Sequence, residues 1–217
     1  MKKALLLSFA IICFSQTFAQ VKIGLRVAPS LSINRVNDKD ATDLFTFDRN
    51  GAGIGFTAGP IVDFYLSDNY AITTGIWYSS KRAGYEVSSL GGKFERVVGL
   101  QYVQLPVLFK LFTNEIATDM KLYFSVGATV DVKIAEKLRK QNPALVGNYE
   151  NSFQPLDLGV YAGAGVEMQL GTNTSAFGGI FYNRGLLNQA KNRDNFKFKD
   201  AVDYGVDLLG LEVGLKF

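Results

Sequence analysis

The segment from Leu156 to Leu170, LDLGVYAGAGVEMQL, alternates strictly between apolar residues and residues that are mostly small or polar. A period of two over this length is typical of one β-strand with two chemically opposite faces. Strands of globular proteins average about 5 to 6 residues, whereas a tilted strand needs about 9 to 11 to cross a bilayer. The segment is therefore long enough to cross a membrane, and what its apolar face meets is the central question.

Similar alternation elsewhere in the chain predicts seven further antiparallel strands. The eight expected strands cover 21–28, 53–66, 70–81, 100–112, 120–133, 156–170, 175–184 and 204–217. Their expected connections run long, short, long, short, long, short, long, at 30–51, 67–69, 84–98, 113–119, 134–155, 171–174 and 185–203. Outer-membrane barrels have short periplasmic turns at one end and longer extracellular loops at the other. The sequence therefore predicts an all-β, eight-stranded antiparallel up-and-down transmembrane β-barrel with four long loops.

Two details refine this strand assignment. Pro60 and Pro106 fall inside expected strands, where a missing N–H disfavours regular pairing, so we expect a bulge or a strand end at each. The stretch 134–141 within the third long loop has an amphipathic spacing of its residues that is compatible with a short helical turn.

The N-terminus carries the features of a secretory signal peptide. Lys2 and Lys3 precede an uncharged stretch, 4–14, and a small-residue exit that ends at Ala19. We expect cleavage after Ala19, which leaves 20–217 as a single barrel domain. Without Lys2 and Lys3 the formal net charge falls from +3 to +1, and no basic block is present that would indicate nucleic acid as a partner.

The absence of two residue types limits the chemistry. The chain has no histidine, and its single cysteine, Cys13, lies in the expected signal peptide. A Ser-His or Cys-His nucleophile and a histidine metal site are thereby excluded. A carboxylate pair could still act, but none stands out at the loop ends, and Asp200 and Asp203 lie in an expected loop. We therefore expect no enzyme, cofactor or metal site.

A soluble barrel with its apolar face inward would show the same period, so other features must decide between the two arrangements. The polar face is rich in glycine, aromatic residues gather near the strand ends of the apolar face, and the polar face carries both signs of charge. These features favour an apolar face toward lipid. In a barrel of eight strands the interior charges would pair across the lumen and form a plug. The predicted lumen charges are Lys22, Arg26, Asp63, Lys110, Lys121, Asp131, Asp157, Glu167, Glu212 and Lys216.

Several segments carry a resemblance to a known family. They are the Phe-Ala-Gln end of the signal, QYVQLPVLFKL (Gln101 to Leu111), DLGVYAGAGVEMQLG, FYNRGLLNQ (Phe181 to Gln189) and the LGLEVGLKF terminus. In this order and spacing the chain resembles the PorT-like outer-membrane β-barrel family of Bacteroidota. The resemblance implies an integral protein surrounded by outer-membrane lipid. It also implies insertion by the barrel assembly machinery, which recognises a final aromatic-ended strand, so Phe217 would be the assembly signal.

The leading hypothesis is a non-enzymatic outer-membrane protein that contributes to envelope structure or surface interaction through its four long loops, with a surface or periplasmic protein partner left unidentified. The alternatives are an accessory of a protein-secretion system, as the resemblance implies, a small-solute channel, and a soluble periplasmic ligand-binding barrel. The exposed loop candidates are Asp38, Lys39, Asp40, Lys137, Arg139, Lys140, Lys191, Arg193 and Lys197.

Overall fold

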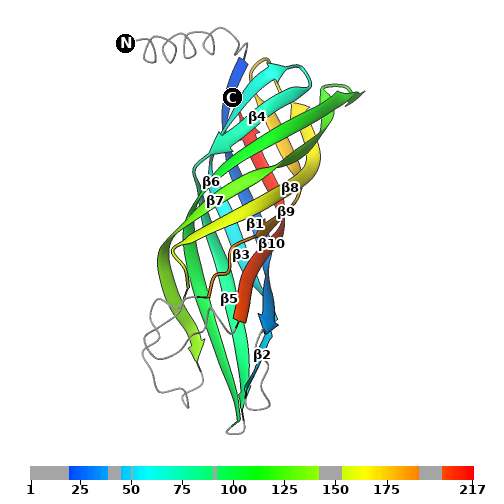
Figure 1. Cartoon of the computed structure of the whole chain (residues 1–217). Helices are drawn as coiled ribbons and strands as arrows, with labels where there is room; N and C mark the ends of the chain where they lie inside the picture. Colours follow the sequence, from blue (N-terminus) through cyan, green and yellow to red (C-terminus); the bar gives the residue numbers. More distant parts are fainter. Residues whose placement is uncertain (1–19, 39–44, 50, 90–91, 142–152, 191–201) are drawn as a thin grey trace, which may run out of the picture.

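The computed structural model describes residues 20–38, 45–49, 51–89, 92–141, 153–190 and 202–217. These residues form ten antiparallel strand segments that run along a tall, tilted tube (Figure 1). The segments are β1 (Gln20–Asp38), β2 (Phe45–Arg49), β3 (Ala52–Ser67), β4 (Tyr70–Gly75), β5 (Trp77–Ser89), β6 (Gly92–Ala117), β7 (Met120–Gln141), β8 (Leu156–Gln169), β9 (Ser175–Gly185) and β10 (Val202–Lys216).

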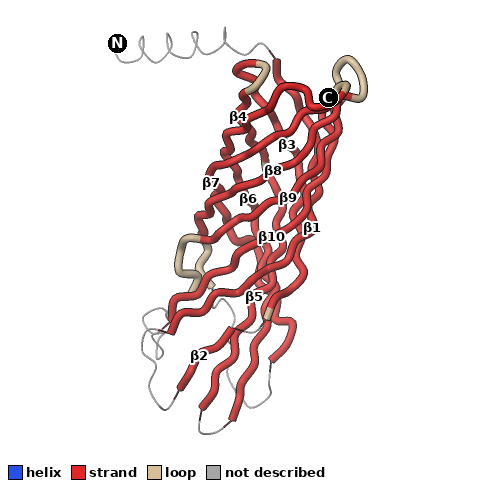
Figure 2. The backbone as a smooth tube through the Cα atoms, turned by 90° about the vertical axis from the view of Figure 1, so that its right-hand side faces the viewer, coloured by secondary structure: helices blue, strands red, loops and turns tan. Residues whose placement is uncertain are grey.

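The ten segments occupy eight positions around a closed ring (Figure 2). β2 and β3 both pair with β5 and share one position, while β4 and β5 both lie between β3 and β6 and share another. The remaining six segments take one position each, and the pairing of β1 with both β10 and β3 closes the ring. Closure removes the free sheet edges that would otherwise invite aggregation. The predicted eight-stranded up-and-down barrel is confirmed.

The prolines explain why one strand is interrupted. β4 ends at Gly75 and β5 begins at Trp77, which leaves Ile76 between them. The pairing of β4 and β5 with β3 skips the region of Pro60, and their pairing with β6 skips the region of Pro106. Because proline has no N–H to donate, the strand between these two prolines lacks ladder bonds on both sides.

The two ends of the barrel differ as the turn lengths predict. The start of β1 and the C-terminus lie at one end (Figure 1), where Phe217 N donates to Ile23 O at 2.8 Å. Tight turns join β3 to β4, β6 to β7 and β8 to β9 at this end, and Asp119 takes a left-handed conformation with φ 59° in one of them. We call it the short-turn end and the opposite one the loop end.

At the loop end the strands continue well beyond the expected boundaries. β1 runs to Asp38, β5 and β6 form a long hairpin across the expected loop 84–98, and β7 runs to Gln141. The predicted loops are therefore wrong at 30–38, 45–49, 84–89, 92–98 and 134–141, where the chain is in strands, and the helical turn at 134–141 is wrong as well. The cause is that both faces of these extensions carry polar side chains, so the hydrophobic period is lost although the backbone pairing continues.

The outer wall of the ring is apolar and its inner face is polar or aromatic. On β8, for example, Leu158 and Val160 are exposed, whereas Asp157 and Tyr161 are buried. The exposed residues of the eight positions form a continuous apolar belt, which includes Val27, Ile54, Val107, Val126, Ile180 and Leu211. Within the described ranges no helix is long and apolar enough to cross a membrane.

Candidate functional site

The candidate site is the interior of the barrel, where buried charges lie at successive levels along the axis. At the level nearest the short-turn end, Lys216 is fully buried and its Nζ contacts two acids from other strands. It lies 2.8 Å from Asp63 Oδ2 on β3 and also pairs with Glu167 Oε2 on β8. Lys110 Nζ approaches Asp63 Oδ2 at 3.2 Å, and the Thr73 hydroxyl donates to Asp63 Oδ1 at 2.6 Å. This level therefore connects β3, β6, β8 and β10.

The middle level is centred on Arg26 and Glu212. Arg26 Nε donates to Glu212 Oε2 at 2.7 Å, and the Arg26 guanidinium stacks over the ring of Trp77 with its centre 4.2 Å from the centroid. The hydroxyls of Tyr123 and Tyr161 donate to the two Glu212 oxygens at 2.7 and 2.8 Å. The pair is thus surrounded by aromatic groups from β5, β7 and β8, and the two tyrosine hydroxyls hydrogen-bond to its carboxylate. Among the described residues, Arg26 Nη1 and Trp77 Nε1 are buried without a hydrogen-bond partner.

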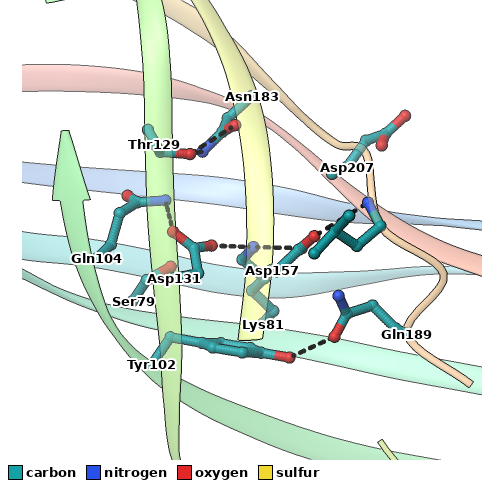
Figure 3. Close-up of polar contacts among 12 residues, drawn as sticks. Ser79, Lys81, Tyr102, Gln104, Thr129, Asp131, Asp157, Asn183, Gln189 and Asp207 are labelled. Atoms are coloured by element: carbon teal, nitrogen blue, oxygen red, sulfur yellow. Dashed lines mark hydrogen bonds and ion pairs between the residues drawn. The ribbon is translucent and has the colours of Figure 1, made fainter. Parts of the chain in front are cut away.

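The third level, toward the loop end, places one cation between two acids (Figure 3). Lys81 Nζ lies 2.5 Å from Asp131 Oδ2 and 3.8 Å from Asp157 Oδ2. Asp131 and Asp157 are directly opposite in the β7–β8 pairing, so their carboxylates would repel without the lysine. The Gln104 amide donates to Asp131 Oδ1 at 2.7 Å. These four side chains are all nearly fully buried.

Chain segments beyond the strands enter the barrel at the loop end. Phe153 and Ala190 form a β-bridge and are buried, and Gln189 N donates to Tyr204 O at 2.8 Å. The Phe153 and Tyr204 rings meet edge to face with centroids 5.3 Å apart. They belong to an apolar cluster with Leu100, Tyr102 and Val206.

Glycines on the inner face make room for the large interior side chains. A Cβ at Gly214 would lie 2.4 Å from the ring of Phe177, and one at Gly165 would lie 2.6 Å from the Tyr123 hydroxyl. Such separations are far below van der Waals contact, so only glycine fits without displacement of the ring. The glycine-rich polar face noted in the sequence therefore has a packing role.

Eight of the ten predicted lumen charges take part in the three levels: Arg26, Asp63, Lys110, Asp131, Asp157, Glu167, Glu212 and Lys216. The other two, Lys22 and Lys121, are half-buried at the short-turn end. Lys22 Nζ donates to Gln169 Oε1 at 3.0 Å, and both lysines line an open cavity of about 610 Å³. Phe217 is exposed at the end of β10.

Sequence reasoning missed Lys81 and the pair of Arg35 with Asp207. Lys81 shares its face with Trp77 and Ser79, and this parity could have identified it, but it stood at the expected end of a strand. Of the loop candidates, Lys137, Arg139 and Lys140 are exposed on β7 and Asp38 ends β1. Lys39, Asp40, Lys191, Arg193 and Lys197 lie outside the described residues, as do residues 1–19 and Asp200.

In the described part of the interior, the acidic side chains are arranged for pairing with cations. Among the residues that the structure describes, no three acidic or thiol side chains converge as metal ligands. The buried acids instead face lysine, arginine, tyrosine and glutamine, so the arrangement is one of charge pairing.

Comparison with known proteins gives a family and a set of structural likenesses. Residues 14–189 match the family profile described as outer membrane protein beta-barrel domain. No curated protein matches the chain. The chain is similar to the outer membrane protein OprG from Pseudomonas aeruginosa, at 10% sequence identity and a TM-score of 0.49, over 89% of this chain and 95% of that chain. It is also similar to Neisserial surface protein A, at 10% identity and a TM-score of 0.49, over 91% and 99% of the two chains.

Proposed function

Because the chain belongs to the outer membrane protein beta-barrel domain family, we propose that it is an integral, non-enzymatic protein of the outer membrane whose lumen is closed by its own side chains. Its role would be in the envelope or in surface interaction, through the loop end. The PorT-like subgroup, the signal peptide at 1–19, assembly through Phe217 and a surface or periplasmic partner stay predictions from the sequence.

The contacts of Lys216 support the closed lumen most directly. Its ammonium group bridges Asp63 on β3 and Glu167 on β8, which are not neighbouring strands in the ring. A bridge of this kind crosses the interior. An eight-stranded barrel has an interior only wide enough for side chains. Toward the loop end from Lys216, this interior also holds the two other charged levels and the apolar cluster around Tyr204, which leave little room for a solute path.

The outer wall supports the placement in lipid. Its belt of exposed aliphatic residues is what a bilayer solvates, and in water it would form an apolar patch far larger than soluble monomers expose. Near the short-turn end, Tyr70 and Phe109 stack on this wall with centroids 5.8 Å apart. Aromatic residues at that height are typical of a membrane interface.

Three measurements test this proposal: gel migration and planar-bilayer conductance of the purified chain, and fractionation of cell membranes. A folded barrel migrates differently in SDS gels before and after boiling, and it stays with the membrane fraction until detergent is added. Release into buffer without detergent would contradict the membrane placement and favour a soluble ligand-binding barrel. In planar bilayers the protein should show no steady conductance, whereas a large and steady single-channel current would contradict the closed lumen and favour a solute channel.

A further inference from the structure

A second charged cluster lies on the outer wall, outside the interior levels. Asp207 on β10 accepts a hydrogen bond from Arg35 Nε at 3.0 Å and another from the Tyr182 hydroxyl at 2.7 Å. Tyr182 is exposed and the Arg35 side chain is 39% exposed, so both partners belong to the outer face. Asp207 is directly opposite Arg184 on β9, which is also exposed. We call Arg35, Tyr182, Arg184 and Asp207 the arginine patch.

The arginine patch has one more positive charge than its own acid can compensate. Both Asp207 oxygens are occupied, one by Arg35 and the other by Tyr182. Arg35 also donates through Nη2 to Gly185 O. Arg184 is exposed, and no hydrogen bond or ion pair joins its side chain to another of the described residues. A guanidinium presents a planar fork that suits the oxygens of a phosphate.

On β1 and β10 the exposed apolar residues end at the arginine patch, whereas on β8 and just after β9 exposed leucines continue past it toward the loop end: Leu156, Leu158, Leu186 and Leu187. On the short-turn side of the patch, Leu209 and Leu211 are exposed on β10 and Ile180 is exposed on β9. Val160, which is also exposed, is directly opposite Arg184 on β8. Tyr182 within the patch has the amphipathic character that places tyrosine at a lipid–water boundary. The arginines therefore lie at the margin of the apolar belt on β1 and β10, immediately beside a surface that acyl chains would cover.

We propose that the arginine patch binds the phosphate group of a membrane lipid, with Arg184 as the principal ligand and the acyl chains packed on Val160, Ile180 and Leu209. The inference rests on the proposed placement of the apolar belt in lipid. A lipid is favoured over free phosphate because the patch lies on the outer wall, where a lipid adds apolar contacts that a free ion lacks.

Native mass spectrometry of the full chain in a neutral detergent tests the proposal. The probes are dioleoylphosphatidylglycerol, dioleoylglycerol, which has the same chains without the phosphate, and inorganic phosphate. The test variant is Arg184→Gln, which leaves the Arg35–Asp207 pair intact. The matched control is Arg139→Gln, which removes an exposed arginine on β7 at the same end of the barrel. A second test variant, Arg35→Gln with Asp207→Asn, removes the other arginine without leaving its acid unpaired.

We expect the phosphatidylglycerol to bind and the diacylglycerol and inorganic phosphate to bind at least about tenfold more weakly. Arg184→Gln and the double variant should weaken phosphatidylglycerol binding by about tenfold, and Arg139→Gln should leave it unchanged. Equal binding by Arg184→Gln and the unmodified chain would overturn the proposal, as would an equal loss in Arg139→Gln or equally tight binding of inorganic phosphate. Heat-modifiable migration of each variant separates these outcomes from failure of the barrel itself.

Discussion

Replacement of Lys216 by methionine removes the charge that joins two sides of the interior while it keeps a side chain of similar length. Two acids lose a partner in Lys216→Met. Asp63 retains Lys110 at 3.2 Å and the Thr73 hydroxyl at 2.6 Å. Glu167 retains only hydroxyls, those of Tyr65 at 3.2 Å and Ser175 at 3.1 Å. The substitution therefore removes the salt bridge of the buried Glu167 carboxylate.

The expected loss of unfolding free energy in Lys216→Met follows from the salt bridge that Glu167 loses. Removal of one partner from a buried ion pair typically destabilises a protein by about 3 to 5 kcal/mol. Lys22→Met is the matched control, since Lys22 is half-buried on the same face and donates to one neutral amide, Gln169. A hydrogen bond of that kind contributes about 1 kcal/mol.

Urea unfolding in lipid vesicles measures both variants. Trp77 is the only tryptophan of the chain and is buried beside Arg26, so its fluorescence reports on the interior. The double variant Lys216→Met with Glu167→Gln should recover about 2 kcal/mol or more of the loss, because it removes the unpaired charge. The reasoning is refuted if Lys216→Met costs no more than Lys22→Met, or if Glu167→Gln adds to the loss instead of reducing it.

Three further changes have defined outcomes. Gly214→Ala places a methyl group against Phe177 and should lower the unfolding free energy, measured with urea, by about 1 to 3 kcal/mol. Gly171→Ala is the control and should be close to neutral, because nothing lies within 4 Å of its added Cβ. Equal effects of the two substitutions would contradict the packing role of the inner-face glycines. Lys81→Met should cost at least as much as Lys216→Met in the same assay, because Asp131 and Asp157 both lose their cation; a loss under about 1 kcal/mol would contradict this. Phe217→Ala should lower the yield of heat-modifiable barrel in cells. Because Phe217 is exposed, the unfolding free energy of the purified protein should change by under about 1 kcal/mol. A normal yield would contradict its role as an assembly signal.

The barrel was predictable because each strand in its central part has one face toward the outside of the barrel and one toward the polar interior, and the two faces carry different residue types. Leu158 and Asp157 are neighbours in sequence and opposite in environment, and this contrast repeats along β8 and β7. Where both faces carry polar groups, as from 84 to 89 in β5, the contrast disappears while the backbone pairing continues. Sequence reasoning therefore ended these strands too early.

The same cause hid two parts of the charge arrangement. Lys81 stood at an expected strand end, yet β5 continues to Ser89 and so places Lys81 inside the ring. Asp207 shares its face with Leu209 and Leu211, which marks it as an outward residue without an evident partner. Its partner, Arg35, lies in an expected loop and reaches Asp207 only because β1 pairs with β10 to close the barrel. Partners joined by ring closure are remote in sequence and leave no local pattern.

An arginine scan along β7 tests most directly whether the apolar wall faces lipid. Val126 lies in the middle of the belt and Leu138 lies on the loop-end extension of the same strand, and both are about half exposed. In lipid vesicles Val126→Arg should cost about 2 to 4 kcal/mol of unfolding free energy, whereas Leu138→Arg should cost about 0 to 1 kcal/mol. Equal costs at the two positions, or a neutral Val126→Arg, would contradict a lipid-facing belt.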